Sequence, residues 1–514
     1  MRHVIQILLF WVLATTAYAQ SGNTPFRLEL DAPENIFPYE VITLGEKGVI
    51  VYYESDIISR NTAKWSFVHF DVFFKRTWTK NFYLHRDLEP VKTYSDSINI
   101  GILFNYQGKR KIEFPNQLVQ INIQDTSSFA YTIEIPENTF PNHLLIGGNY
   151  SYFSLLSRDR EILYQLNTTS KVLRNFTPTD IKELRIPFIT QNPLYHEGVL
   201  FGVLSTVSKR SNQLELKYLD TSGIVINELL IPEDSRFFIN TANLVKTGED
   251  SLLIIGNYVN SSDKSGVFSS PEIPNTGIFA VAIHQNQIVN RKYYNFSRFH
   301  NIYKYVTEQD LRRVQKRMKD NEDDSQPGYS LNLKLISQPP LLFDSVVVFV
   351  NEAYFAEYRT EENLSYDYYG RPFPNNRTIF DGYRYTNGIV CGLNPNGDLL
   401  WDNNFALNNI LSYQLNPRIT FFLDSTDLLM AYNYNGEIVT MIVEGHNVLQ
   451  NLEYSKVENI SSSDFVLENQ KTDIVYWYDQ YFLSYGYQTI RNTQKRGRSR
   501  ANVFYMIKMI YDVQ

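Results

Sequence analysis

Asn394 to Trp401, read as NPNGDLLW, is the stretch that decides the fold. Its Asn and Gly residues permit the positive φ angles that a tight hairpin needs. The Trp after the turn opens a motif, W-x-x-N-F-x-L, that ends at Leu407 and recurs far earlier in the chain at Trp78 to Leu84. A motif repeated at such a separation indicates repeated structural units, each with a turn followed by a strand.

A second repeat sets the number of units. A short apolar run ending in Asn-Tyr, or a weaker relative of it, occurs at Val49–Glu54, Gly101–Tyr106, Leu145–Tyr150, Val199–Ser205, Leu253–Tyr258, Val346–Tyr354, Leu429–Tyr434 and Tyr481–Tyr487. Each run precedes another β-like run, giving units of roughly 40 to 60 residues that must stack to bury both faces. The repeat predicts an all-β chain forming a single β-propeller of eight blades, with seven as the alternative. A pair of β-sandwiches is the competing architecture.

The composition agrees with a folded β protein. Of 514 residues, 43% are hydrophobic, 15% are aromatic and 20% are charged, which excludes global disorder and favours strands. The formal net charge of -7 argues against nucleic acid as a partner.

The N-terminus predicts export. Arg2 and His3 precede an apolar run from Val4 to Leu13, and Ala17-Tyr-Ala19 is a small-x-small cleavage site. We expect a signal peptide over 1–19 and a propeller over 20–514, placing the mature chain in the periplasm, at the cell surface or outside the cell. The apolar run is too short to cross a bilayer, so no transmembrane segment is expected.

The two ends of the propeller are expected to meet. Nothing after Asn502–Tyr511 can serve as the outer strand of the last blade, whereas Pro25–Leu30 precedes the first complete unit. This N-terminal strand is therefore predicted to complete the last blade.

The Gly turn followed by Trp resembles the repeat of PQQ-like and WD-type propellers. The resemblance implies that Trp78 and Trp401 are structural residues docked between blades. The stretch from Glu352 to Leu407 is also similar to secreted propeller proteins of an uncharacterised Bacteroidota-type family. That similarity implies an origin and no activity.

Four long connections are expected on one face of the propeller, which we call the insertion face. They are Asn257–Asn275, Ser297–Tyr329, Phe355–Tyr385 and Gln488–Ala501. The insertion at 297–329, between blades 5 and 6, is predicted to contain a short basic helix from Thr307 to Lys319. Asn492–Arg500 is a basic loop tip. Long loops are more often functional than idle, so the site is predicted around blades 5 and 6.

The blade 6 connection carries the predicted binding residues. Tyr and Arg dominate binding hot spots, and the same side chains suit stacking against sugar rings. The predicted set is Tyr354, Tyr358, Tyr368, Tyr369, Arg371, Tyr383 and Arg384. The alternative is a self-packed Ω-loop whose tyrosines bury against their own blade.

No sequence motif identifies a catalytic centre. The His residues are scattered without metal-binding spacing, and neither a metal nor a cofactor is predicted. The acid–base candidates for glycoside cleavage are Glu352, Glu357, Asp367 and Asp381. The leading hypothesis is a secreted, non-enzymatic propeller that binds a protein or a surface glycan through the insertion face. The alternatives are a carbohydrate-active enzyme, glycosidase or lyase, acting at the propeller mouth, and a structural envelope component.

Overall fold

The computed structural model describes residues 26–510, apart from 35, 107–115, 134–138, 158–159, 178–182, 195–197, 209–210, 262–272, 306–311, 313–330, 367, 370, 409, 458–463 and 493–499. The described chain is almost entirely β-structure, arranged in eight antiparallel sheets. We number these sheets 1 to 8. The prediction of an all-β protein is confirmed.

The first four sheets follow one another along the chain. Sheet 1 contains β2 (Glu40–Thr43), β3 (Val49–Ile57), β4 (Thr62–Phe70) and β5 (Arg76–His85). Sheet 2 contains β6 (Leu88–Ser95), β7 (Asn99–Tyr106), β8 (Asn116–Asn122) and β9 (Ser128–Ile133). Sheet 3 contains β10 (Phe140–Gly147), β11 (Tyr150–Leu156), β12 (Glu161–Asn167) and β13 (Leu173–Asn175). Sheet 4 contains β14 (Leu184–Arg185), β15 (Ile189–Gln191), β16 (Val199–Ser208), β17 (Ser211–Leu219) and β18 (Val225–Ile231).

The last four sheets continue the series. Sheet 5 contains β19 (Phe237–Ile239), β20 (Asn243–Gly248), β21 (Ser251–Asn260), β22 (Gly277–His284) and β23 (Gln287–Asn295). Sheet 6 contains β24 (Leu335–Ser337), β25 (Leu341–Phe343), β26 (Val346–Tyr366), β27 (Pro372–Leu393), β28 (Leu399–Ala406) and β29 (Leu411–Ser412). Sheet 7 contains β30 (Thr420–Asp424), β31 (Asp427–Tyr434), β32 (Glu437–Glu444) and β33 (Asn447–Lys456). Sheet 8 contains β34 (Asp464–Tyr478), β35 (Tyr481–Asn492), β36 (Arg500–Ile510) and β1 (Phe26–Asp31).

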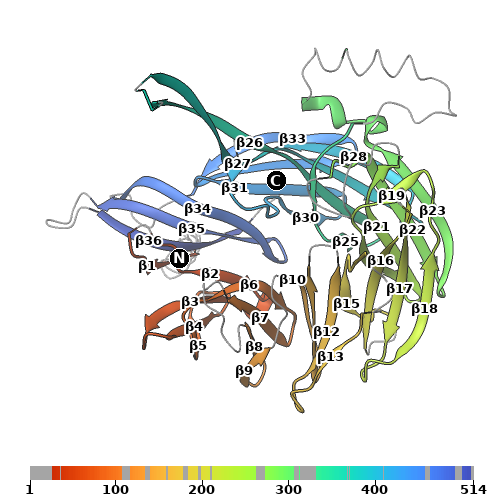
Figure 1. Cartoon of the computed structure of the whole chain (residues 1–514), viewed down its shortest axis with the longest axis horizontal. Coiled ribbons are helices and arrows are strands. Elements are labelled where there is room, and N and C mark those ends of the chain that lie inside the picture. The colour runs from red at the N-terminus through yellow and green to blue at the C-terminus, as the bar shows by residue number, and fades with distance from the viewer. Residues whose placement is uncertain are drawn as a thin grey trace, which may run out of the picture.

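The sheets are arranged in a propeller-like way. Their first strands, such as β2, β10 and β30, lie toward the middle of the molecule, and their last strands, such as β5, β18 and β33, lie toward the rim (Figure 1). Tight turns join the first strand to the second, and residues in the left-handed region carry these turns, among them Asp344, Ser425 and Asp479. Asp and Ser tolerate this conformation because their short side chains bond to the local backbone.

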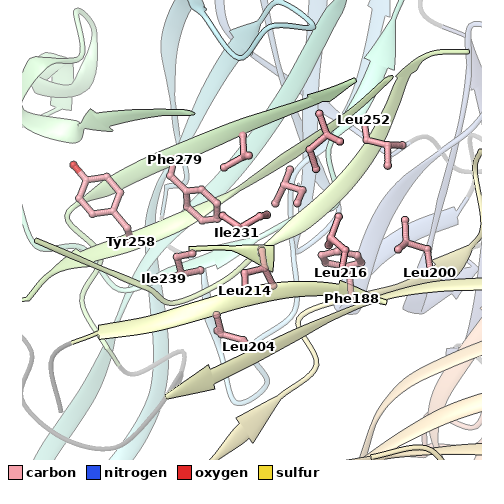
Figure 2. Packing of buried hydrophobic residues seen from close by; sticks show 14 of the residues in the cluster. Phe188, Leu200, Leu204, Leu214, Leu216, Ile231, Ile239, Leu252, Tyr258 and Phe279 are labelled. Carbon is pink, nitrogen blue, oxygen red and sulfur yellow. The ribbon is translucent and has the colours of Figure 1, made fainter. Parts of the chain in front are cut away.

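The core lies between sheets rather than within one. Each of the eight hydrophobic clusters found among the described residues is shared by two consecutive sheets. Between sheets 4 and 5, for example, Leu214 and Leu216 pack against Leu252 and Phe279 (Figure 2). One cluster joins sheet 8 to sheet 1, through residues such as Phe504 and Val51.

Buried polar side chains reinforce five successive contacts between sheets. Each such side chain reaches from one sheet to the backbone or a polar side chain of the next. The bonds are Glu161 to Ile186 N, Asn212 to Ile239 N and O, Asn257 to Ser337 Oγ, Glu352 to Ile419 N, and Asn433 to Ser484 Oγ. A buried polar group left unpaired is costly, so these bonds fix how neighbouring sheets are set against each other.

The N-terminal strand completes the last sheet. β1 pairs antiparallel with β36, from Phe26 opposite Lys508 to Asp31 opposite Val503. The predicted pairing of the two ends is confirmed.

Two sequence-based assignments differ from the structure or fall outside it. Leu145–Tyr150 was expected to be one strand, but Gly148 has a φ of 57° and turns the chain between β10 and β11. The helix predicted from Thr307 to Lys319 lies outside the described residues except for Arg312; the start of the 297–329 insertion forms part of η2 (Phe296–Arg298) and η3 (Ile302–Tyr305). η1 (Gly45–Lys47) lies between β2 and β3. Among the described residues, no helix is long and apolar enough to span a bilayer.

Candidate functional site

Sheet 6 projects a two-stranded arm, formed by the connection that was predicted to carry the binding residues. β26 and β27 continue to pair beyond Tyr354 and Tyr385, as far as Tyr366 opposite Pro372 (Figure 1). We call the paired residues 355–366 and 372–384, with the turn between them, the arm. The predicted loop is therefore a hairpin, and the interpretation as a self-packed Ω-loop is wrong. The physical reason is the backbone pairing itself, which holds Tyr, Phe, Thr and Ile side chains on a pleated surface that suits them.

One face of the arm is aromatic. Tyr385, Tyr354, Tyr383, Phe380, Tyr358 and Tyr413 form a series that we call the aromatic ladder. Neighbouring ring centroids lie 4.9 to 6.4 Å apart along the series, with Phe380 contacting Tyr383, Tyr358 and Tyr413. Tyr385 is 1% exposed, whereas Tyr358 is 60% and Tyr413 is 70% exposed. The ladder thus begins in the core and ends in solvent.

The arm also carries charged pairs that are separate from the ladder. Arg384 contacts the Glu357 carboxylate, and this contact raises the pKa of the Arg384 guanidinium. Arg359 lies 3.8 Å from Asp381 and 3.4 Å from Glu361. Glu357 and Asp381, two of the acid–base candidates, are thus next to arginines on the arm.

The tip of the arm presents two tyrosines. Tyr368 is 97% exposed and Tyr369 is 81% exposed, with their rings edge to face at 5.5 Å. Arg371 is exposed beside them. Adjacent exposed aromatic rings give the tip a small continuous apolar surface.

The structure separates the predicted binding residues into three groups by exposure. Tyr358, Tyr368, Tyr369 and Arg371 are exposed, while Tyr383 and Arg384 are half-buried. Tyr354 is 4% exposed and packs at the base of the arm. Their role in binding stays a prediction.

Glu352 is a structural residue, not an accessible acid. It is fully buried, and its carboxylate accepts bonds from the backbone N–H groups of Arg418 and Ile419 and from Gln338 Nε2, at 2.8 to 2.9 Å. Burial raises its pKa to about 7 against the opposing effect of these donors. Asp367, the remaining candidate, lies outside the described residues.

Trp78 and Trp401 occupy matching positions. Each stands on the strand after the turn and is half-buried against a cluster shared by neighbouring sheets, sheets 1 and 2 for Trp78 and sheets 6 and 7 for Trp401. Trp78 stacks on its cross-strand partner His69 with centroids 5.1 Å apart, and Trp401 lies over its partner Gly392.

Sequence reasoning missed a set of polar residues on the first strands of the sheets. Five of them pair with the fifth residue of the following strand, so they occupy equivalent positions in their sheets. They are Lys92, His143, Asn243, Thr420 and Asp473. The first strands of the sheets lie toward the middle of the molecule (Figure 1), so we call these five residues the inner set. Aligning the strand before each apolar run would have revealed them.

Three groups of this inner set have shifted pKa values. Burial raises the pKa of Asp473 to about 6, opposed by the charge of Arg418 and by Tyr485, whose hydroxyl lies 3.4 Å away. Burial lowers the pKa of His143, although the Glu161 carboxylate 3.9 Å away favours its charged form. Burial likewise lowers the pKa of Lys92. In the part of the chain described, no group of three His, Cys, Asp or Glu residues suits a metal ion.

Arg418 connects the inner set to the arm. Its guanidinium donates to Ser412 Oγ at 2.6 Å and lies 5.8 Å from the ring centre of Tyr385, the buried end of the aromatic ladder. It also influences the pKa of Asp473. Arg418 therefore interacts electrostatically both with Tyr385 at the base of the arm and with Asp473 of the inner set.

Comparison with known proteins finds no matching family model and no matching curated protein. Solved structures with a distant likeness include the polysaccharide lyase Uly1, at 8% identity over 82% of this chain and 90% of that chain, with a TM-score of 0.41. The Dos1 propeller is 8% identical over 82% of this chain and 95% of that one, with a TM-score of 0.39. A prolyl endopeptidase is 6% identical over 83% of this chain and 50% of that one, also at 0.39. Likenesses at this level assign no function to the chain.

Proposed function

We propose that the chain is a secreted binding protein, built as one eight-bladed propeller over residues 20–514, whose arm carries the recognition surface. The eight sheets are the blades, and the pairing of β1 with β36 closes the ring. The ring is the rigid support, and the ligand is a protein or a glycan at the cell surface.

The exposure of aromatic side chains on the ladder and at the tip of the arm is the observation that carries this proposal. Tyr358 on the ladder and Tyr368 and Tyr369 at the tip are 60%, 97% and 81% exposed, so their rings are available to a partner. Tyr loses little side-chain entropy on binding and offers both an apolar ring and a hydroxyl. The ladder is also anchored in the core through Tyr354 and Tyr385, so it meets a partner already ordered.

Replacing the exposed rings tests the proposal. Tyr358→Ala, Tyr368→Ala and Tyr369→Ala together should abolish capture of the partner from native envelope material while the melting temperature stays within a few degrees of wild type. Tyr83→Ala is the matched control, because Tyr83 is 62% exposed on the outer strand β5 of sheet 1. Wild-type capture by the arm variant, or equal loss by the control, would sink the proposal.

A carbohydrate-active enzyme is the second candidate, favoured by Asp473. This half-buried acid stands on an inner strand beside Tyr485 and Arg418, with a pKa raised to about 6, so it holds a proton to give in mildly acidic solution. Asp473→Asn should then abolish release of reducing or unsaturated ends from envelope polysaccharide. If the wild-type protein releases neither kind of end, the enzymatic candidate is excluded.

A further inference from the structure

A cleft lies on the insertion face beside the arm. It has a volume of about 820 Å³ and is lined by sheet 7 on one side and by sheet 8 on the other. Sheet 8 forms one side of the cleft because β34 and β35 continue to pair beyond Tyr487. Their pairing extends as far as Asp464, which lies opposite Asn492. The volume falls in the range of sites that bind small molecules.

The lining is rich in uncharged hydrogen-bonding groups. It contains four amides and three phenols, which are Asn408, Asn435, Asn469, Gln488, Tyr432, Tyr434 and Tyr454. One carboxylate, Glu437, and one ammonium, Lys456, add charges of both signs. Amides both donate and accept, so this surface suits a neutral ligand with many hydroxyl groups.

Several of these side chains are held in place before any ligand arrives. Tyr454 is 48% exposed, and its hydroxyl accepts a bond from Asn408 Nδ2 at 2.9 Å. Gln488 is 1% exposed and donates to Asn469 Oδ1 at 2.9 Å. Gly436 packs directly on Asn469, where any added Cβ would lie 2.4 Å from Asn469 Cγ. Such fixed groups lose little entropy on binding.

The cleft is continuous with the arm. A few residues after Asn408, Leu411 and Ser412 pair with Arg384 and Tyr383 of the arm, and Tyr413 follows in the aromatic ladder. Tyr434 of the cleft is also close enough to Arg384 to influence its pKa. A chain-like ligand lying in the cleft can therefore reach the ladder.

We infer that this cleft binds a neutral oligosaccharide. Sugar hydroxyls need closely spaced donors and acceptors, which the amides supply, and the apolar face of a sugar ring stacks on an exposed Tyr such as Tyr454. The balanced charges of Glu437 and Lys456 favour a neutral saccharide over an anion. The inference rests on the proposed binding role of the insertion face and adds the class of ligand.

The test uses calorimetry with the chain from residue 20 onward and neutral hexasaccharides prepared from β-1,4-glucan, xylan and mannan. At least one should bind, and Tyr454→Ala should weaken it about tenfold or more, the loss of one strong contact. Tyr454→Phe keeps the ring and should retain most of the affinity. Tyr83→Ala is the control for removing an exposed Tyr elsewhere, and the melting temperature of each variant reports folding.

Either of two calorimetric results would overturn the inference. One is that none of the hexasaccharides binds the wild-type protein, and the other is that Tyr454→Ala and Asn408→Ala bind as well as wild type. The triple arm variant, with Tyr358→Ala, Tyr368→Ala and Tyr369→Ala, distinguishes failure of this inference from failure of the proposed function. Loss of envelope capture in the arm variant, together with unchanged capture in the cleft variants, leaves the arm as a binding site and removes the cleft. Capture of a protein through the cleft without saccharide binding also contradicts it.

Discussion

Gly392 leaves the space that the Trp401 indole fills. A Cβ added at residue 392 would lie 2.2 Å from Trp401 Cε2, and a rigid ring packed between sheets cannot move away cheaply. We expect Gly392→Ala to lower the free energy of unfolding by about 1–3 kcal/mol. Gly147→Ala is the control, because a Cβ there meets nothing within 4 Å. Urea unfolding of both variants measures the difference, and equal stability would show that the indole is free to shift.

Two carboxyl groups with raised pKa values, the buried Glu352 and the half-buried Asp473, predict how stability depends on pH. The pKa of Glu352 is raised to about 7 and that of Asp473 to about 6, above the values near 4 of unfolded chains. The folded protein therefore holds these protons more tightly, and the free energy of unfolding falls as pH rises from about 4 to 7. Glu352→Gln combined with Asp473→Asn should match wild type at pH 4.5 and lose less stability by pH 7.5. Urea unfolding at both pH values tests this, and an undiminished slope in the variant would contradict it.

At the residue scale, sequence reasoning found side chains whose role is visible in a local pattern. The shared motif around Trp78 and Trp401 could be read because turn and Trp lie close together in the chain. Glu352 was misjudged as an accessible acid, since its partners Arg418 and Ile419 belong to the next sheet. Burial of this kind depends on contacts between sheets, which the periodicity of one strand does not report.

The arm is an element added to sheet 6 and not a part of its core. Its strands pair with each other beyond Glu357, so removing residues 359–379 and joining the ends through an Asn-Gly turn should leave the eight sheets folded. We expect the melting temperature to stay within about 2–4 °C of wild type, the size of a small change in stability for a large domain. Scanning calorimetry makes the measurement. A fall of more than 10 °C would mean that the arm packs into the ring.

At the element scale, apolar runs predicted most strands, because the second strand of a sheet is buried on both faces and reads as a continuous apolar segment. The run at Leu145–Tyr150 failed since Gly148 turns the chain there. The arm was predicted as a loop because its Tyr, Arg and Asn residues resemble loop composition. Half-exposed strands lack the apolar continuity that identifies buried ones, and only the pairing of β26 with β27 reveals them.

At the scale of the whole molecule, β1 joins the two ends of the described chain. Leu28 and Leu30 pack against the cluster between sheets 8 and 1, and Arg27 donates to Gln488 at 2.7 Å. A chain starting at residue 33 should therefore lose several kcal/mol of stability, well above a surface change of about 0.5 kcal/mol. It should also self-associate through the uncovered edge of β36.

Thermal unfolding and size-exclusion chromatography of this shortened chain test both expectations. Adding a peptide of residues 26–31 should restore part of the lost stability, because the strand then pairs in trans. If the shortened chain stays monomeric and has the melting temperature of the wild-type protein, the stability of the fold does not depend on β1.

The pairing of β1 with β36 also determines when sheet 8 can be completed during folding. β1 is synthesised long before β36 and cannot pair until β36 has been made, and closing so long a loop is slow. Until then sheet 8 has an open edge, and sheets 1 to 7 form an open arc whose end sheets each expose one apolar face. For a chain exported as we propose, folding could therefore finish only after β36 has crossed the membrane and can pair with β1.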